Sequence, residues 1–197
     1  MESYAQNTPR TPRNRNRWTT KQLVVMALMC AIAILLSFIA FPLFPAASFL
    51  KLDVALVPST VVGFAYGPGP GLLVGIACAV AHAAITGNWV GCLMSSIVAV
   101  AFIAPSAAIY KRNRTLKGAA IGLVAATLCL IVGVTIANLV IDPLFYGMPF
   151  DAVLALVMPA IVPFNVIKGI AVSLLTALVY KSISNLITPE KDQVKSR

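Results

Sequence analysis

Long apolar segments follow one another along most of the chain, separated by short polar or glycine-rich links. A helix needs about 20 apolar residues to cross a hydrocarbon core of about 30 Å, and a short or tilted helix needs somewhat fewer. The segments are longer than tilted barrel strands and lack their alternation, so the sequence predicts an all-α membrane protein. The six predicted transmembrane helices are 22–41, 53–66, 71–86, 89–110, 118–141 and 159–187.

Composition supports the membrane setting. Hydrophobic residues make up 59% of the 197 positions and charged residues only 11%, whereas a soluble domain has about 25% charged residues. The mean hydropathy of +0.91 agrees with this. The links are short, so the pattern predicts one domain at 19–188. A polar, disordered basic arm is expected at 1–18 and a polar tail at 189–197, with a tight turn at 67–71, "GPGPG".

Basic residues gather at three places that a six-helix topology puts on one side. Membrane proteins carry excess Lys and Arg on the cytoplasmic side, so both termini are expected to be cytoplasmic. This topology, with attraction to anionic lipid head groups, explains the net charge of +9 without nucleic-acid binding. The three groups are Arg10, Arg13, Arg15, Arg17 and Lys21; Lys111, Arg112, Arg114 and Lys117; and Lys181, Lys191, Lys195 and Arg197.

Several kinds of chemistry have no motif in this chain. There is no GxxxxGK[ST] loop for a nucleotide and no acidic residue at mid-depth of a predicted span, where coupled carriers usually keep one. The four cysteines show no metal-like spacing, and one histidine cannot build a His/Cys site. No enzyme, metal or cofactor is therefore predicted, and the energy for any transport is expected to come from a partner.

The segment 163–169, "PFNVIKG", places Asn165 and Lys168 one turn apart inside an apolar helix. An ionisable residue within a membrane is by default a functional-site hypothesis. An amide donates and accepts, and an ammonium donates up to three hydrogen bonds, so the pair suits a ligand with alternating C=O and N–H groups. The structural alternative is that Lys168 snorkels outward or pairs with Asp53, Asp142 or Asp151.

Four motifs in order carry a family resemblance: "FLKLD" at 49–53, "VPSTVVGFAYGPGPG" at 57–71, "AHAAITG" at 81–87 and "PFNVIKG". The chain resembles the riboflavin-specific S component of energy-coupling factor (ECF) vitamin transporters. The resemblance implies a six-helix subunit in the prokaryotic plasma membrane that binds riboflavin near the extracellular face. It also implies docking on a transmembrane scaffold subunit with two ATPase subunits, and flavin contacts from Asn165, Lys168 and Asn138.

Further candidates for the ligand site lie in the outer loops and on the third helix. Phe49 and Tyr146 would cover a flat ring or serve as interfacial anchors. Asp53 and Lys51 add charge near the outer face, and His82 is either a ligand contact or a hydrogen-bonded structural residue. Riboflavin S components often carry acidic and amide residues before this histidine. This chain has "VGIACAVAH" there, which leaves the ribityl chain without obvious partners.

The first helix offers a docking surface. Ala27 and Ala31 form an AxxxA pair, which permits close helix approach to the scaffold subunit or within the protein itself. Two alternatives to riboflavin capture remain open. One is an S component for another vitamin or for flavin mononucleotide (FMN), and the other is a self-sufficient carrier or channel.

Overall fold

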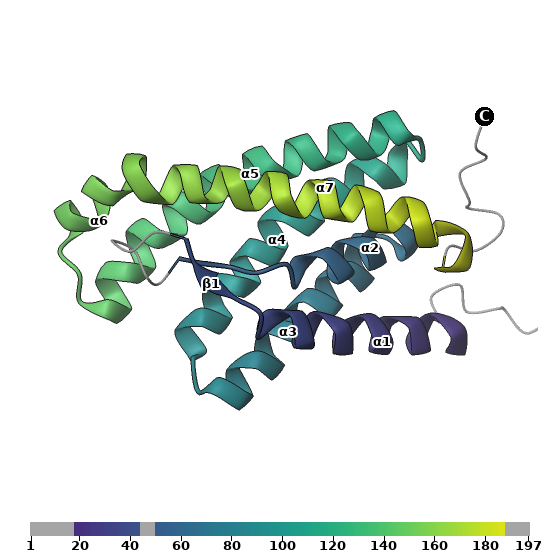
Figure 1. Ribbon diagram of the computed structural model, residues 1–197, viewed down its shortest axis with the longest axis horizontal. Helices are drawn as coiled ribbons and strands as arrows, with labels where there is room; N and C mark the ends of the chain where they lie inside the picture. Colours follow the sequence, from purple (N-terminus) through teal and green to yellow (C-terminus); the bar gives the residue numbers. More distant parts are fainter. Residues whose placement is uncertain (1–17, 44–49, 188–197) are drawn as a thin grey trace, which may run out of the picture.

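The computed structural model describes residues 18–43 and 50–187; the predicted arm at 1–18, apart from Trp18, and the predicted tail at 189–197 lie outside them. Figure 1 shows a bundle of roughly aligned helices, with α6 at one end and the last turns of α7 at the other. Within the described residues, five helical segments are long and apolar enough to cross a membrane, and α2 is a shorter apolar helix. The elements are α1 (Thr20–Ser37), β1 (Phe41–Pro42), β2 (Lys51–Leu52), α2 (Leu56–Tyr66), α3 (Pro68–Thr86), α4 (Trp89–Arg112), α5 (Leu116–Tyr146), α6 (Phe150–Leu156), a π turn (Val157–Ile161) and α7 (Val162–Ile187).

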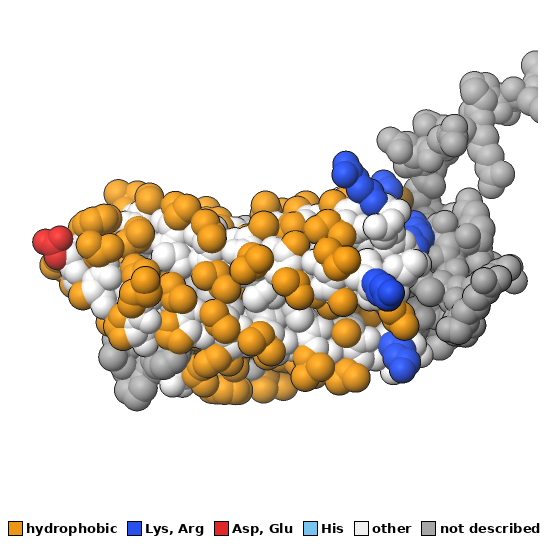
Figure 2. All heavy atoms as spheres, turned by 90° about the horizontal axis from the view of Figure 1, so that it is seen from above, with side chains coloured by type: hydrophobic (Ala, Val, Ile, Leu, Met, Phe, Trp, Pro, Cys, Tyr) orange, Lys and Arg blue, Asp and Glu red, His pale blue; other side chains and the backbone are white. Residues whose placement is uncertain are grey.

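The surface divides by polarity along the bundle. Figure 2 shows hydrophobic side chains over most of its length and Lys and Arg side chains at one end. We call this the basic end; it includes the last turn of α4 with Lys111 and Arg112, the first turn of α5 with Lys117, and the last turns of α7 with Lys181. The opposite end, which carries α6, is called the far end.

Several predicted boundaries were wrong, each for a local reason. The first predicted helix ends early because Phe41–Pro42 pairs antiparallel with Lys51–Leu52. The second begins at Leu56 because Asp53 Oδ1 accepts a hydrogen bond from the Ala55 N–H at 3.1 Å, ahead of the helix. The turn was predicted at 67–71, but only Gly67, at φ 102°, lies between the two helices, and α3 begins at Pro68. Proline fits the first turn of a helix because the N–H groups there have no partner within the helix.

The far end holds the other two differences. The fifth helix was predicted to stop at residue 141, but α5 continues through Pro143 and ends at Tyr146, before Gly147 at φ 63°. Proline so near the C-terminus costs the helix only one of its last hydrogen bonds. The last predicted helix is preceded by α6 and the π turn, so α7 itself begins at Val162.

The short helix α2 forms the centre of the bundle. Every residue from Leu56 to Ala65 is buried, and α1, α3, α4 and α7 all pack against the helix. Phe64 stacks on Tyr110 with ring centroids 4.6 Å apart. A helix covered by protein on all sides needs no lipid-facing surface, which explains how Ser59 and Thr60 sit in it fully buried.

We expect Gly71→Ala to destabilise the protein by about 1–3 kcal/mol, because an added methyl group overpacks the contact between α2 and α3. A Cβ at Gly71 would lie 2.6 Å from the Gly63 Cα. Thermal unfolding in detergent measures the effect. Gly69→Ala is the matched control, since nothing lies within 4 Å of its Cβ position. Equal unfolding midpoints for the two variants would contradict the close packing.

Candidate functional site

The far-end start of α7 carries the polar residues of the "PFNVIKG" segment. Pro163 lies directly after the π turn, where the Val162 N–H bonds back to the Val157 carbonyl, so the helix continues into α7 without a break. Lys168 follows about 9 Å into the helix at 1.5 Å per residue. Asn165 and Lys168 are both buried, with 1% and 8% of their surface exposed. The first turns of α7 therefore place an amide and an ammonium inside the protein and not toward lipid.

An ion pair joins Lys168 to the segment before α2. The Lys168 Nζ donates to Asp53 Oδ2 at 2.9 Å, with side-chain exposures of 10% and 24%. The same ammonium lies 6.0 Å from the centre of the Phe164 ring. Asp53 thus contacts both Ala55 and Lys168, so it fixes the start of α2 against α7. The pair was one of the structural alternatives for Lys168, and it leaves the ammonium with two further N–H donors.

Asn165 has an amide that the rest of the described protein does not satisfy. Neither its Nδ2 nor its Oδ1 has a hydrogen-bond partner among the described residues, although both atoms are buried. Folded proteins pair most buried polar atoms, because each unpaired one costs about 1–3 kcal/mol. Such an orphaned amide is typical of a binding site, since a ligand edge with one donor and one acceptor would satisfy both atoms.

The far-end half of α5 adds a second polar face. Asn138 and Asp142 are both 1% exposed and lie four residues apart, on one side of the helix. The Asn138 Nδ2 donates to the Val134 carbonyl at 2.8 Å. The Asp142 Oδ2 is buried without a partner among the described residues.

Asp142 was missed as a candidate contact because the fifth helix was predicted to end before it. The signal was present in "ANLVID", where Asp142 follows Asn138 at helical spacing. A carboxylate that accepts hydrogen bonds and lacks a partner is the counterpart of the Asn165 amide.

Apolar side chains surround the polar groups at this end of the bundle. They form a buried cluster with contributions from α6, the π turn, α7 and the segment after 49. A flat aromatic ligand would find an apolar wall here beside the polar edge of α7. The buried members of the cluster are Leu50, Val153, Ala160, Ile161 and Phe164.

The remaining candidates have different surroundings. The His82 Nδ1 lies 2.7 Å from the Ser37 Oγ, and its ring packs against Phe38 at 4.9 Å between centroids. These contacts join α1 to α3, as expected of a structural histidine. Lys51 is exposed in β2, and Tyr146 is half exposed at the end of α5. Phe49 lies outside the described residues.

No group of three His, Cys, Asp or Glu side chains gathers in the described part of the chain to hold a metal ion. The four cysteines, Cys30, Cys78, Cys92 and Cys129, are free thiols. The chemistry of the far end is therefore that of hydrogen bonding and apolar contact.

Comparison with known proteins identifies relatives over nearly the whole chain. The family described as "ECF transporter, substrate-specific component" matches residues 21–180. A protein named riboflavin transporter RibU from Staphylococcus aureus is 30% identical over 182 residues, which cover 89% of this chain and 96% of the relative. Riboflavin transporter FmnP from Bacillus subtilis is 28% identical, covering 87% of this chain and 96% of the relative.

Solved structures agree with the fold. A structure described as the S component of a bacterial ECF transporter superposes with a TM-score of 0.76 at 31% identity, covering 86% of this chain and 98% of that one. ThiT from Listeria monocytogenes has a TM-score of 0.54 at 17% identity, covering 85% of this chain and 97% of that one, and shares the fold alone. Together with the apolar helices, the family match shows that this chain is a multi-pass membrane protein and belongs to the substrate-specific components of ECF transporters.

Proposed function

We propose that this protein captures riboflavin at the far end of the bundle and delivers it with a separate ATP-driven module. The observation that carries the proposal is the buried Asn165 amide, whose two polar atoms have no partner in the described residues, one turn from Lys168. The pyrimidine edge of a flavin alternates C=O, N–H and C=O. An amide reads such an edge with two hydrogen bonds, and an ammonium donates to the second carbonyl.

The rest of the flavin fits the same end of the bundle. The apolar ring body would lie against the cluster around Leu50 and Phe164. Asp142 and Asn138 on α5 offer acceptors and a donor for ribityl hydroxyls, which the apolar helix α3 does not provide. The phosphate of FMN would be repelled by the carboxylates at this end, which outnumber the lysines, so the charge favours riboflavin over FMN. The carboxylates are Asp53, Asp142 and Asp151, and the lysines are Lys51 and Lys168.

The proposed topology has six spans, with both termini and the basic end in the cytoplasm. The positive-inside rule supports this orientation. The helix α2 would be the sixth span. Its 11 residues extend only about 16 Å, but the surrounding helices shield it from lipid. The far end then faces outward, where the vitamin is met, in the plasma membrane of a prokaryotic cell.

The proposed partners are a transmembrane scaffold subunit and two ATPase subunits. The AxxxA pair on α1 supports scaffold docking, because Ala27 and Ala31 are both exposed and so available to another helix. We assign the protein no enzymatic activity of its own, because the chain has no nucleotide-binding loop. Riboflavin is cargo and not a cofactor.

The proposal is tested by purifying the protein in detergent and titrating flavin fluorescence. We expect flavin absorption in the purified protein and quenching that saturates at one riboflavin per chain, with FMN competing poorly. Uptake into vesicles should require the scaffold and ATPase subunits. Unchanged fluorescence at all protein concentrations would reject riboflavin as cargo, and uptake by the chain alone would favour a self-sufficient carrier.

A further inference from the structure

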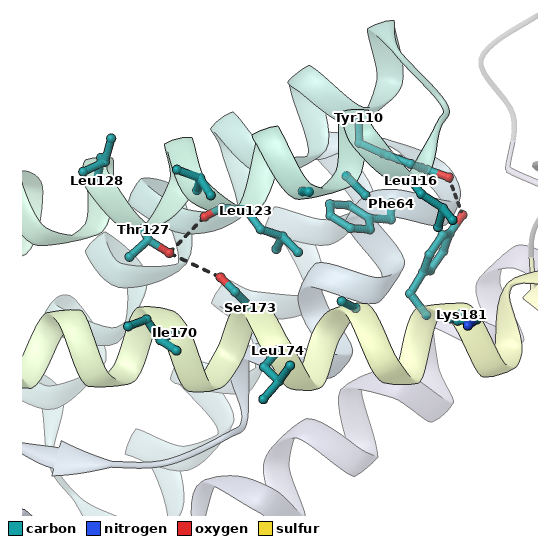
Figure 3. Close-up of a pocket in the computed structure, with 15 residues that line it drawn as sticks. Phe64, Tyr110, Leu116, Leu123, Thr127, Leu128, Ile170, Ser173, Leu174 and Lys181 are labelled. Carbon is teal, nitrogen blue, oxygen red and sulfur yellow. Dashed lines mark hydrogen bonds between the residues drawn. The ribbon is translucent and has the colours of Figure 1, made fainter.

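A groove of about 740 Å³ lies between α5 and α7, and its lining includes none of the residues assigned to the ligand site. The two helices touch closely at Gly169, where an added Cβ would lie 2.5 Å from the Thr127 Cγ2. Figure 3 shows the groove bordered by Leu123 and Leu116 of α5 on one side and by Ile170, Leu174 and Lys181 of α7 on the other. The groove extends from this close contact, where Thr127 is part of its lining, to Leu116 and Lys181.

The hydroxyl groups in the groove already have partners. The Thr127 hydroxyl donates to the Leu123 carbonyl at 2.9 Å and lies 3.3 Å from the Ser173 hydroxyl. The Tyr110 hydroxyl donates to the Tyr180 hydroxyl at 3.3 Å (Figure 3). The rest of the lining is mainly aliphatic and aromatic. A lining of this kind favours a hydrocarbon chain over a polar solute, because a polar solute would lose its hydrogen bonds to water.

The length of the groove matches one leaflet of a bilayer. Its lining on α5 runs from Leu116 to Leu128, which is about 18 Å at 1.5 Å per residue. One leaflet supplies about half of a 30 Å hydrocarbon core.

The mouth of the groove carries positive charge. Lys181 belongs to the lining, and Lys117 directly follows the lining residue Leu116. Both lysines are exposed at the basic end. Basic residues at this depth attract anionic lipid head groups.

We propose that the groove between α5 and α7 holds one acyl chain of an anionic phospholipid, with the head group against Lys181 and Lys117. The site is distinct from the riboflavin site, shares none of the residues assigned to it, and does not depend on the identity of the vitamin. An acyl chain here would fill the groove and contact both α5 and α7.

Native mass spectrometry of the detergent-purified full chain tests the proposal, with phosphatidylglycerol and phosphatidylcholine of identical acyl chains as probes. We expect one phosphatidylglycerol to be retained more tightly than phosphatidylcholine. Ala177→Phe fills the groove and should abolish this retention, whereas Lys181→Gln should weaken it about fivefold. The matched controls are Ala84→Phe, on the exposed surface of α3, and Lys21→Gln, on α1; both should retain the lipid as wild type does.

A photoactivatable acyl chain gives a second readout that needs no variant. Crosslinks on Leu123, Leu174 or their neighbours would support the proposal. Equal retention of the two lipids, crosslinks spread over all the exposed helices, or unchanged retention in Ala177→Phe would overturn it in favour of ordinary annular lipid. If Ala177→Phe left lipid retention intact and blocked assembly with the scaffold subunit, the groove would be a protein interface and the proposal would also fail.

Discussion

Lys168→Ala is expected to weaken riboflavin binding by about 10- to 150-fold. The substitution removes a hydrogen bond from a charged donor, which contributes about 1.5–3 kcal/mol. It also leaves the Asp53 carboxylate, 24% exposed, without the ammonium that lies 2.9 Å away, which destabilises the ligand-free protein. Fluorescence titration of the purified variant measures the affinity. Thermal unfolding of the ligand-free protein measures how much stability is lost with the Asp53–Lys168 pair.

The matched control is Lys51→Ala, which removes an exposed lysine two residues before Asp53 and should leave the affinity within about twofold. Asp53→Asn separates the two roles of the lysine, because it keeps the ammonium and removes the negative charge. If Lys168→Ala lowered the unfolding midpoint and bound riboflavin normally, Lys168 would serve only the ion pair, and its assignment to the ligand site would be wrong.

Asn165→Leu is expected to have opposite effects on stability and on binding. Leucine has a similar shape and removes two buried polar atoms that lack partners in the described protein, so the ligand-free form should gain about 1–3 kcal/mol. Binding should weaken by more than about a hundredfold, because the flavin edge would lose two hydrogen bonds and be buried unpaired. The thermal unfolding midpoint and the riboflavin titration are measured on the same preparation.

Thr176→Val controls for the stability gain. Thr176 is fully buried on the same helix, and its hydroxyl also lacks a partner among the described residues. It lies about two turns beyond Lys168, so its replacement should stabilise the protein and leave the riboflavin affinity unchanged. A destabilised Asn165→Leu protein with normal affinity would show that the amide serves the fold and not the ligand.

Local sequence signals predicted most of the helices, because apolar runs and glycine or proline links act over a few residues. They also identified Asn165 and Lys168 as candidate site residues, since burying a polar residue in a membrane segment costs free energy. The sequence named three possible acidic partners for Lys168 and could not choose Asp53 among them, because the pair joins residues 115 positions apart. Asp142 was missed as a ligand contact because the fifth helix was predicted to end at residue 141, whereas α5 continues to Tyr146. The α5–α7 groove depends on how two whole helices cross, which no local pattern encodes.

The short central helix has a consequence for how the chain enters the membrane. Leu56–Tyr66 is about 16 Å long and includes Ser59, Thr60 and Gly63, so alone it is too short and too polar to cross the bilayer. Gly67 turns the chain directly into α3, and Gly63 and Gly71 let the two helices meet almost backbone to backbone. During synthesis α2 is therefore expected to insert together with α3 as one helical hairpin, with the later helices closing around it.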